Sequence, residues 1–584
     1  MLNPRFNWRI ENPDDGAVRT IMSELGLSEP VAKVLANRGL DTPEKAKAFL
    51  EPSLDNLHDP LLLDGMDRAV DRMIRALEGN ERILVVGDYD VDGVTGATLL
   101  VDFLRKREAR VMYHIPDRES EGYGLSVEVV HKARDAGYSL LAIVDSGTTA
   151  FEAIAEAKSV GIECIVLDHH EPGDSLPEAV AVVNPKLNGS SYPFRDLAAV
   201  GVVFKFLQAL SGRLGGGDEW VEKAMELVAL GTVADLMPLL DENRAFVIHG
   251  LSKMHESVSP GLSALLKVAG ISREREVSAQ QVSFGLAPRI NAAGRVWKPN
   301  AGVDMLLTDD PDRALALAAK LDEKNRERMR EESWMLESAL EMIKGQFDPA
   351  ADKSVVLFNE KWLVGVVGIV AARILDRYYR PVILFTASKK PQDVELAGEG
   401  RGHVCAGSAR SINGVDIHRA LERASDLLIT FGGHSMAAGV RIFENDIPKF
   451  RERLNEIVGE MYEGDFTPTL RVDTELRLKD VSMDLLDRIK VLEPCGVGNP
   501  RPVFYTSGVT VLETRQCGGG GKHLKMNVGQ GSVMMDAIGF GLGERWPVSE
   551  LAGEAVDVAF VLREDYFRGR RSVALQIRDI RSAG

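Results

Sequence analysis

The chain has 584 residues, more than one hydrophobic core usually supports, and its length predicts about three to five domains. Hydrophobic residues make up 45% of the sequence and charged residues 27%, a balance typical of folded proteins. No apolar run approaches the roughly 18 residues that a membrane-spanning helix needs. The formal net charge of −17 argues against a protein that coats itself with nucleic acid.

The start of the chain and its cysteines bear on where the protein works. The first residues contain no apolar core and no small-residue cleavage site, so we expect no secretory signal. The four cysteines lie far apart and form no CxxC pair, which argues against a disulfide framework or a thiolate zinc site. We therefore expect a cytoplasmic protein. Two stretches, 281–300 and 515–535, contain basic residues and no acid, so basic channels in an acidic body remain open.

The first 80 residues or so differ from the rest of the chain. Residues 1–60 are predicted to be helical, and RGLDTPEKAKAFL marks a helix start with Asp41 as its cap and Pro43 in its first turn. From about residue 80, short apolar runs alternate with amphipathic stretches, the βαβ rhythm of a parallel sheet covered on both faces. The runs are ERILVVGDYD, RVMYHIP, SLLAIVDSG and IECIVLDHH, with helices from Gly96 to about Arg107 and over AFEAIAEAKSV.

Three of these runs end in aspartate where the strand should stop. They are ILVVGD, LLAIVD and CIVLD. Because the carboxyl ends of parallel strands line the ligand crevice of an open α/β sheet, we expect Asp88–Asp92, Asp145 and Asp168–His170 to converge. Asp235, in ALGTVADLMPL, follows a predicted helix and offers a further carboxylate.

The second half of the chain changes pattern twice. Residues 311–345 are predicted to form one long helix bracketed by Pro311 and Gly345, and its charged middle is typical of a helix that bridges two bodies. A second α/β pattern comes next, with KSVVLFN, VVGIVAARIL, RPVILFTA and a glycine-rich segment that ends in FGGHSMAAG. From about residue 466, short strands with one helix suggest a small antiparallel barrel.

The clustered carboxylates predict a metal site. Several carboxylates within a few Å repel one another, and a divalent cation removes that cost. Oxygen ligands with imidazole suit Mn²⁺ or Mg²⁺, and four separate segments could hold two ions, the usual arrangement for in-line hydrolysis of phosphoesters.

Each member of this set also has a simpler interpretation. DYDVDG could open a calcium loop, but Leu99 stands where such a loop needs Glu, and a strand precedes the motif. Asp145 could cap a helix, because Ser146-Gly147-Thr148 comes after it. The pair His169-His170 could be a turn with one structural histidine. Asp235, taken alone, could equally be a metal ligand or an ordinary polar residue.

VVGDYDVDGVTGA, VDSG, LDHH and GTVADLMPL, in this order, resemble the successive motifs of the DHH phosphoesterase superfamily, and FGGHSMAAG resembles the hallmark of its DHHA1 domain. Within this superfamily, the chain resembles most the RecJ family of bacterial single-stranded-DNA exonucleases. The motifs that carry this resemblance include PRINAAGR, GSARSI and PCGVGNPRPVF. This resemblance implies two α/β domains, DHH and DHHA1, joined by a long helix, plus a C-terminal OB-fold-like β-barrel. The implied boundaries are 1–75 for an N-terminal helical region, 76–310 for the DHH domain, 311–345 for the helix, 346–462 for DHHA1 and 463–584 for the barrel.

The resemblance also implies roles for single residues. The metal ligands would be Asp90, Asp92, Asp145, His169 and Asp235, with Asp88 and His170 as ligands or immediate supports. Asp90, Asp92, His169 and His170 would carry catalysis, and His170 could act as an acid or stabilise the pentacovalent phosphorus. Two Mn²⁺ or Mg²⁺ ions are the implied cofactors.

Fixed positive donors near the metals would seat the strand. The candidates are Arg118, Arg289, Asn291, Arg295, Ser408, Arg410 and His434. By resemblance, four of them, Arg118, Arg289, Ser408 and Arg410, would hold the 5′ phosphate and the first nucleotides, and GSARSI is predicted at a helix start, a ready anion site. The simpler interpretations are surface salt bridges for Arg118, solvent contacts for the basic loop of Arg289 and Arg295, and tight helix packing for the glycines around His434.

In the barrel, an aromatic and basic cluster suggests a single-strand platform at a hairpin tip, although an exposed hairpin of mixed charge would look the same. Its members are Tyr566, Phe567, Arg568, Arg570 and Arg571.

The implied function is metal-dependent 5′-to-3′ hydrolysis of single-stranded DNA to 5′-mononucleotides in recombination and repair, by a monomer. A single-strand-binding protein and a helicase are the implied partners. Two alternatives stay open: a DHH phosphodiesterase for short oligonucleotides or small nucleotides, and a catalytically silent DNA-binding scaffold.

Overall fold

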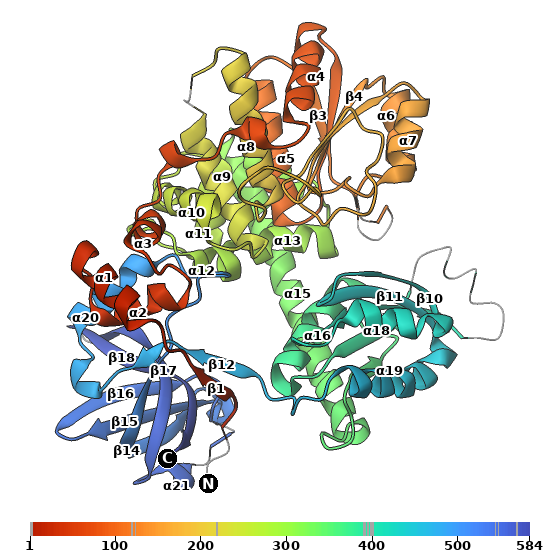
Figure 1. Ribbon diagram of the computed structural model, residues 1–584. Coiled ribbons are helices and arrows are strands. Elements are labelled where there is room, and N and C mark those ends of the chain that lie inside the picture. Colours follow the sequence, from red (N-terminus) through yellow and green to blue (C-terminus); the bar gives the residue numbers. More distant parts are fainter. Residues whose placement is uncertain are drawn as a thin grey trace. The chain divides into compact units, whose positions relative to one another are not determined.

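The computed structural model describes residues 4–583 except 118–120, 123, 218–219, 389–392, 394–395, 397–401, 544, 547 and 568–569. The chain forms two compact units, which are described separately (Figure 1). One unit combines Met1–Leu57, Pro238–Ala245 and Thr467–Gly584, and the other combines His58–Met237 and Phe246–Phe466. Each unit contains parts of several predicted domains, so the predicted domain boundaries stay predictions.

A five-stranded parallel sheet forms the centre of the first α/β body in the larger unit. Its strands, in the order β3-β2-β4-β5-β6, are β3 (Arg110–His114), β2 (Arg82–Val86), β4 (Leu140–Val144), β5 (Glu163–Leu167) and β6 (Ala181–Val183). All four pairings run parallel, so all five carboxyl ends lie along one edge of the sheet. This arrangement confirms the predicted βαβ rhythm.

Helices cover both faces of this sheet. One face packs through Val86, Ile143 and Val166 against α6 and α7, and α5 and α8 contact the strands from the other face (Figure 1). The helices from α4 to α14 are α4 (Met66–Glu78), α5 (Val91–Arg105), α6 (Val127–Asp135), α7 (Phe151–Ser159), α8 (Ala199–Arg213), α9 (Val221–Ala234), α10 (Asp241–Met254), α11 (Pro260–Val268), α12 (Ala279–Gln281), α13 (Ala287–Val296) and α14 (Ala301–Leu307). A π-helical turn, η3 (Val282–Leu286), joins α12 to α13.

The long helix predicted over 311–345 is α15 (Pro311–Gln346), and it connects the first α/β body to a second one. The side chain of Asp310 caps its first turn by accepting the N–H groups of Asp312 and Arg313. The second body is a mixed sheet in the order β10-β11-β9-β8-β7, of which only the β7–β8 pair runs parallel. Its elements are β7 (Val355–Phe358), α16 (Val364–Tyr378), β8 (Val382–Ala387), β9 (Val404–Arg410), α18 (Ile417–Arg423), β10 (Leu428–Gly433), β11 (Ala437–Phe443) and α19 (Ile447–Met461).

The smaller unit contains a closed five-stranded barrel. The strands follow the ring β14-β15-β16-β18-β17, and pairing of β14 with β17 closes it. The sequence predicted an antiparallel barrel. The barrel differs from this prediction at one pairing, because β16 and β18 pair in parallel. Helices α1 to α3 share one hydrophobic core with the barrel strands. The elements of this unit are β1 (Asn7–Ile10), α1 (Asp15–Leu25), α2 (Glu29–Asn37), α3 (Pro43–Leu50), β12 (Thr469–Val472), β13 (Thr474–Glu475), α20 (Met483–Ile489), β14 (Phe504–Cys517), β15 (His523–Gln530), β16 (Val533–Gly539), α21 (Val548–Leu551), β17 (Ala555–Phe567) and β18 (Arg570–Ser582).

Three local predictions were wrong. Helix α5 begins at Val91 rather than Gly96, because the Asp90 side chain caps it. Thr42, not Asp41, caps α3 by accepting the N–H of Lys45, while Asp41 pairs with the ammonium of Lys45. The segment GSARSI, predicted at a helix start, contains the end of strand β9.

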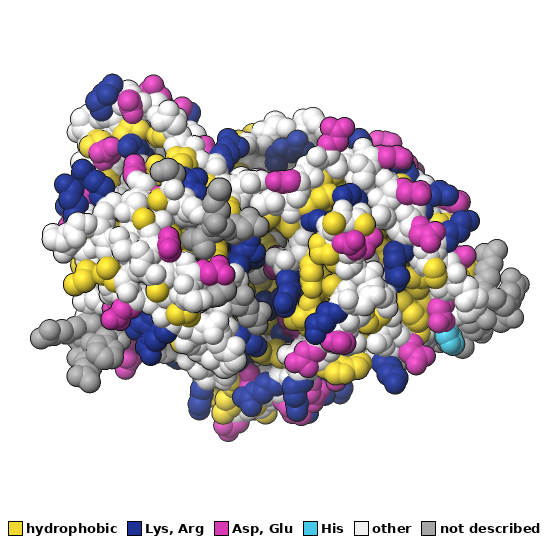
Figure 2. Space-filling view, turned by 90° about the horizontal axis from the view of Figure 1, so that it is seen from below, with side chains coloured by type: hydrophobic (Ala, Val, Ile, Leu, Met, Phe, Trp, Pro, Cys, Tyr) yellow, Lys and Arg dark blue, Asp and Glu magenta, His cyan; other side chains and the backbone are white. Residues whose placement is uncertain are grey.

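One face of the surface carries charges of both signs. Acidic and basic side chains are interspersed over the face shown in Figure 2. Among the described residues, every helix lacks the combination of length and apolar character that crossing a bilayer requires.

Candidate metal centre

The acidic motif forms the turn between β2 and α5. Strand β2 ends at Val86, and Asp88 lies just beyond it with almost no solvent exposure. Asp90 caps α5 by accepting the N–H groups of Asp92 and Gly93 at 2.9 and 3.1 Å. A side chain at Gly93 would collide with the backbone of Asp88 at about 2.5 Å, so the turn requires glycine at this position. The local chain path therefore places three carboxylates at the end of one strand.

Asp92 is fully buried and lies at the beginning of a second helix. Its two carboxylate oxygens accept the N–H groups of Ala199 and Val200, the first residues of α8, at 2.6 and 2.8 Å. A helix N-terminus favours negative charge. Burial and the charge of Asp90 nevertheless raise the pKa of Asp92 to about 7.

Two further carboxylates come from other segments. Asp145 directly follows β4 in the left-handed region, with φ at 61°, and burial followed by the charge of Asp90 raises its pKa well above the ordinary value. Asp235 caps the C-terminal end of α9, and burial followed by the charge of Asp92 raises its pKa to about 8. These groups are therefore costly to ionise together unless a cation balances them.

His169 connects the carboxylates. Its Nε2 lies 3.2 Å from Asp145 Oδ1, 3.6 Å from Asp235 Oδ2 and 3.8 Å from Asp92 Oδ2. Burial and the positive charge of His170 lower the pKa of His169 to about 3. The imidazole is therefore neutral at physiological pH, the form that binds a metal.

His170 has the opposite charge state because Asp168 holds it. His170 Nδ1 lies 2.7 Å from Asp168 Oδ1. Burial alone would lower the pKa of His170, but the hydrogen bond and charge of Asp168 outweigh burial and raise the pKa to about 9. The backbone N–H groups of Thr148, His169 and His170 also donate to Asp168, at 3.0, 2.8 and 3.2 Å. Asp168 thus fixes the turn that carries both histidines.

Sequence reasoning gave no role to Asp168 or to Asn184, which supports the same turn. Asn184 follows β6, and its amide donates to the His170 carbonyl at 2.8 Å and to Thr148 Oγ1 at 3.0 Å. The signal available in the sequence was its position: AVVN ends a strand of the same sheet.

The donor atoms fit divalent cations. Three groups of donors each lie within 4.8 Å of one another: Asp145, His169 and His170; Asp92, His169 and Asp235; and Asp88, Asp90 and Asp145. Asp145 belongs to two groups, as a carboxylate that bridges neighbouring ions would, and His169 can join either of two groups as a ligand to one ion. The set contains carboxylates and imidazoles, which suits Mn²⁺ or Mg²⁺. All six predicted ligands are thus brought together, although they come from four separate segments.

The acid-free segment 281–300 contains α13, which carries three of the predicted strand-binding residues. Arg289 is already paired, with Nε 2.9 Å from Asp322 Oδ1 on α15. Asn291 has a buried Oδ1 that accepts no hydrogen bond from the described residues. Arg295 donates from Nη1 to the Gly365 carbonyl, at the start of α16, at 2.8 Å.

The remaining predicted seat residues lie mainly in the second α/β body. Ser408 and Arg410 share a face of β9, where Arg410 Nη1 donates to Ser408 Oγ at 2.9 Å. A side chain at Gly368 of α16 would meet both of them within 3 Å, so they lie directly beside this helix. His434 is exposed in the turn between β10 and β11, a hairpin rather than a helix-packing site. Arg118 lies outside the described residues.

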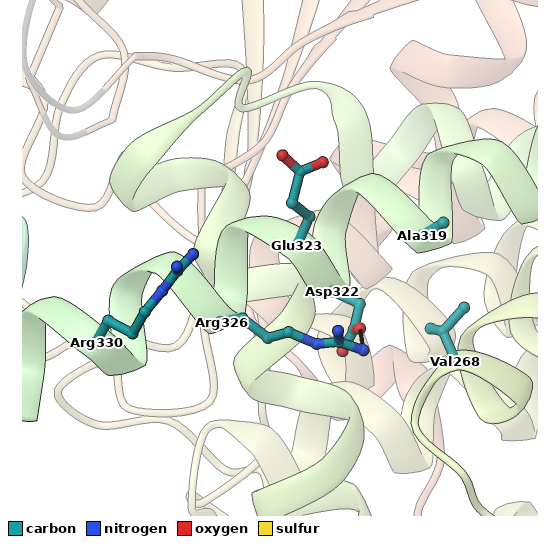
Figure 3. A pocket seen from close by; sticks show the side chains of 6 residues that line it. All are labelled: Val268, Ala319, Asp322, Glu323, Arg326 and Arg330. Atoms are coloured by element: carbon teal, nitrogen blue, oxygen red, sulfur yellow. Dashed lines mark ion pairs between the residues drawn. The ribbon is translucent and has the colours of Figure 1, made fainter.

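A groove beside α15 contains further basic residues close to Arg289 of α13. It is lined by Val268, Ala319, Asp322, Glu323, Arg326 and Arg330 (Figure 3). Asp322 pairs with both Arg289 and Arg326, so its charge is more than balanced. Phe284, on η3, is 76% exposed, and the neighbouring Gly285 carbonyl accepts from Arg289.

The predicted platform at the barrel hairpin is described only in part. Arg568 lies outside the described residues, as do the side chains of Tyr566, Phe567 and Arg570. Arg571 forms ion pairs with Glu564 and, at 3.0 Å, with Asp487. For this arginine, the structure agrees with the simpler interpretation of a hairpin of mixed charge.

Comparison with family models places these features in a known class. The N-terminal domain of the DHH family matches residues 82–232, the DHHA1 domain matches 351–460 and the RecJ OB domain matches 472–579. A parallel sheet with a carboxylate and histidine centre at its edge, followed by these two domains, defines a DHH-type α/β protein.

Similar full-length proteins narrow this class. The single-stranded-DNA-specific exonuclease RecJ of Bacillus subtilis is 36% identical over 99% of this chain and 71% of its own length. The crystal structure of RecJ from Thermus thermophilus in complex with Mn²⁺ is 32% identical, with a TM-score of 0.83 over 99% of this chain and 80% of that one. Its complex with Mg²⁺ is 30% identical, with a TM-score of 0.78 over 99% and 79%. The chain belongs to the RecJ family.

Proposed function

We propose that this protein is a metal-dependent exonuclease that hydrolyses single-stranded DNA. The observation that carries the proposal is the convergence of carboxylate and imidazole donors from four segments, in a chain that belongs to a family of single-stranded-DNA-specific exonucleases. Neither alternative function has a comparable observation in its favour. A silent scaffold would not need a set of buried carboxylates whose pKa values rise in the absence of a cation.

We assign the metal ligands to Asp88, Asp90, Asp92, Asp145, His169 and Asp235. Two divalent cations, when bound there, supply an activated water at neutral pH and positive charge for the phosphate. Asp92 is fixed by α8, and neutral His169 faces three carboxylates, so the ligands are held before the substrate arrives.

His170 has a different task because it is protonated. Asp168 orients its ring and holds the charge, so His170 can donate a hydrogen bond or a proton to an oxygen of the phosphate. We therefore assign catalysis to Asp90, Asp92, His169 and His170.

Contacts lead from the metal centre toward the proposed 5′ seat. A side chain at Gly294 would collide with Tyr89 of the acidic motif, so α13 lies against that motif. Arg295, next along α13, contacts the start of α16, and α16 lies against Ser408 and Arg410. This series of contacts supports seating of the terminal phosphate by Ser408 and Arg410, and hence 5′-to-3′ polarity with 5′-mononucleotides as products. We propose Arg118 and Arg289 as further members of this seat by family resemblance.

We propose that Asn291, Arg295 and His434, together with the groove of Arg326 and Arg330, hold the strand beyond this seat. Exposed Phe284 offers a face for base stacking beside the basic groove. A monomer in the cytoplasm, with a single-strand-binding protein and a helicase as partners in recombination and repair, stays a prediction.

The test uses single-stranded DNA labelled at either end, with Mn²⁺ and the full chain. We expect wild-type protein to release the 5′ label as mononucleotide and the Asp90→Ala variant to release none. Release from the 3′ end would keep the exonuclease and overturn the 5′ seat. Hydrolysis of short oligonucleotides alone would favour the small-substrate alternative. DNA binding without hydrolysis would favour the scaffold.

A further inference from the structure

The loop after β6 reaches the metal centre from the strand next to β5. Because β6 runs parallel to β5, its carboxyl end lies at the same edge as Asp168–His170. Asn184, fully buried in this loop, donates to the His170 carbonyl and to Thr148. Its Oδ1 in turn accepts the backbone N–H of Lys186 at 2.9 Å. One amide side chain thus ties the backbone of Lys186 to the turn that carries both active-site histidines.

The backbone of Lys186 is also fixed from the other side, while the end of its side chain is not. Arg195 Nη2 donates to the Lys186 carbonyl at 2.8 Å. The Lys186 side chain is 18% exposed, and its Nζ lies 3.2 Å from Glu171 Oε1, whose side chain is 59% exposed. Glu171 directly follows His170, so the ammonium group pairs with the turn that carries the two histidines.

The charge of Lys186 acts on residues of that centre. After burial and the charge of His170, Lys186 helps to lower the pKa of His169. Burial and neighbouring aspartates raise the pKa of Asp235, and Lys186 opposes that rise. The ammonium is therefore close enough to influence two proposed ligands from different segments.

Stability alone does not explain this arrangement. An ion pair with a largely exposed carboxylate contributes little to folding. The loop nevertheless fixes the backbone of Lys186 by hydrogen bonds on both sides and leaves the ammonium with an exposed partner that another anion can replace. An ammonium group on a fixed backbone, with an exposed carboxylate as its partner, suits contact with phosphate oxygens.

We propose that Lys186 is a substrate-binding residue whose Nζ contacts a non-bridging oxygen of a strand phosphate held at the metal centre. This inference rests on the proposed function and adds a residue to its site. In the free protein, Glu171 occupies the position that the phosphate oxygen takes in the complex.

The first experiment measures how salt weakens binding. Single-stranded DNA with a fluorescent 3′ end is titrated with the full chain in Ca²⁺, a larger cation that occupies oxygen-rich sites with a more flexible geometry than Mg²⁺ or Mn²⁺. The length of the strand is checked after each titration, so that only binding without hydrolysis is counted. For Lys186→Gln we expect about tenfold weaker binding. The slope of log affinity against log salt should fall by about 0.7, as expected when one contact to a single strand is lost.

Lys158→Gln is the matched control. Lys158 lies on α7 and, like Lys186, pairs with a single exposed glutamate, Glu178, at 2.6 Å. Its loss removes the same charge from the same α/β body, so we expect the wild-type slope. Lys186→Arg should also keep the wild-type slope, because it keeps the positive charge.

A second experiment locates the contact. A neutral methylphosphonate replaces one linkage at a time near the 5′ end, and binding is measured with wild type and with Lys186→Gln. We expect one position at which the modification weakens wild type but weakens the variant no further. Independent losses at every position, or an unchanged salt slope in a Lys186→Gln variant with native circular dichroism, would overturn the proposal.

The Lys186→Arg variant covers the case in which Lys186→Gln does not fold. If Lys186→Arg binds with wild-type affinity and one methylphosphonate linkage still weakens its binding, the result supports a charge contact. A scan in which no linkage weakens its binding contradicts the proposal. Wild-type protein that neither binds nor cleaves single-stranded DNA would instead refute the proposed function, and this inference with it.

Discussion

The metal centre and the predicted strand seat handle charge in opposite ways. At the metal centre, Asp92, Asp145 and Asp235 lie close together, and the positive charge of nearby His170 does not offset their burial and mutual repulsion, so their pKa values rise. At the strand seat, each described arginine is already held by the protein. Arg289 pairs with Asp322, Arg295 donates to a carbonyl and Arg410 donates to Ser408.

This difference separates two requirements of the same enzyme. The centre is electrostatically incomplete without divalent cations, so its stability and its activity both depend on metal. The seat is oriented in advance by neutral or paired partners, so its arginines need little rearrangement when a phosphate arrives. Changes at the centre should therefore alter both folding and catalysis, whereas changes at the seat should alter recognition alone.

Asp145→Asn should have the largest effect. Asparagine accepts the left-handed backbone of this position, so the fold should survive, while a shared ligand loses its charge. We expect hydrolysis to fall by about 10³-fold or more. Without metal at pH 8, the variant should melt at or above the wild-type temperature, because a like charge has been removed. A variant that melts well below wild type would contradict the electrostatic account.

Gly93→Ala should damage the turn that holds the acidic motif. The new methyl group would lie about 2.5 Å from the backbone of Asp88, so α5 must shift. We expect about 1–3 kcal/mol of destabilisation and metal affinity lower by about 10–100-fold. Calorimetric titration with Mn²⁺ measures the second effect. Gly345→Ala, on α15 with no atom near its new side chain, is the control and should keep full metal affinity.

The metal-free protein should lose stability as the pH rises from about 6.5 to 8.5. The folded pKa values of Asp92 and Asp235 lie at about 7 and about 8, above those of the unfolded chain, so in this range the folded protein still binds protons that the unfolded chain has already released. Their stabilising protonation is complete at low pH and lost as the pH passes these values. From these two carboxylates we expect a loss of about 1–3 kcal/mol, and the raised pKa of His170, about 9, adds a loss in the same direction.

The low pKa of His169 acts in the opposite direction, but only below about pH 6.5, where the unfolded histidine binds a proton. Thermal unfolding in a chelator, compared with excess Mn²⁺, measures the difference. An equally steep pH dependence with metal bound would refute the idea that cations balance these carboxylates.

Arg410→Gln should alter recognition without altering the metal centre. We expect KM for a 5′-phosphorylated strand to rise by about tenfold, because a charged hydrogen bond is lost. KM for a strand with a 5′-hydroxyl should change little, and the melting temperature should stay the same. Equal effects on both substrates would place Arg410 away from the terminal phosphate.

Arg571→Gln should have the smallest effect. This arginine lies between Glu564 and Asp487, so little of its charge is available to a strand. We expect affinity for single-stranded DNA to change by less than about twofold, within the range of an exposed ion pair. A tenfold loss in fluorescence binding measurements would restore the hairpin tip as a principal platform.

The sequence was sufficient for the sheet and for the convergence of the metal centre. Strand patterns are local, and parallel strands must bring their carboxyl ends to one edge, so the pattern of apolar runs alone placed Asp88, Asp145 and His169 together. The start of α5 after its Asp90 cap was harder to predict, because residues 90–95 are equally compatible with a turn before a helix that begins at Gly96.

The partners of side chains could not be predicted in the same way. Whether Arg289 meets solvent or Asp322 depends on how α13 packs on α15, and these positions are 33 residues apart. Asn184 was missed because a single amide in a loop has no periodic pattern, and Lys186, to which we propose a role, lies in the same loop. Ser408 and Arg410 were assigned to a helix start because short alternating segments do not distinguish strand from turn.

Closure of the barrel has a consequence for how the protein behaves at high concentration. The ring β14-β15-β16-β18-β17 pairs each strand on both sides, and β16 meets β18 through the pairs Ala537–Leu575 and Ile538–Gln576, so the described barrel strands leave little open sheet edge. Open edges are where sheets of different molecules join and aggregate. The barrel can therefore present its outer surface to other molecules while its backbone resists edge-to-edge association.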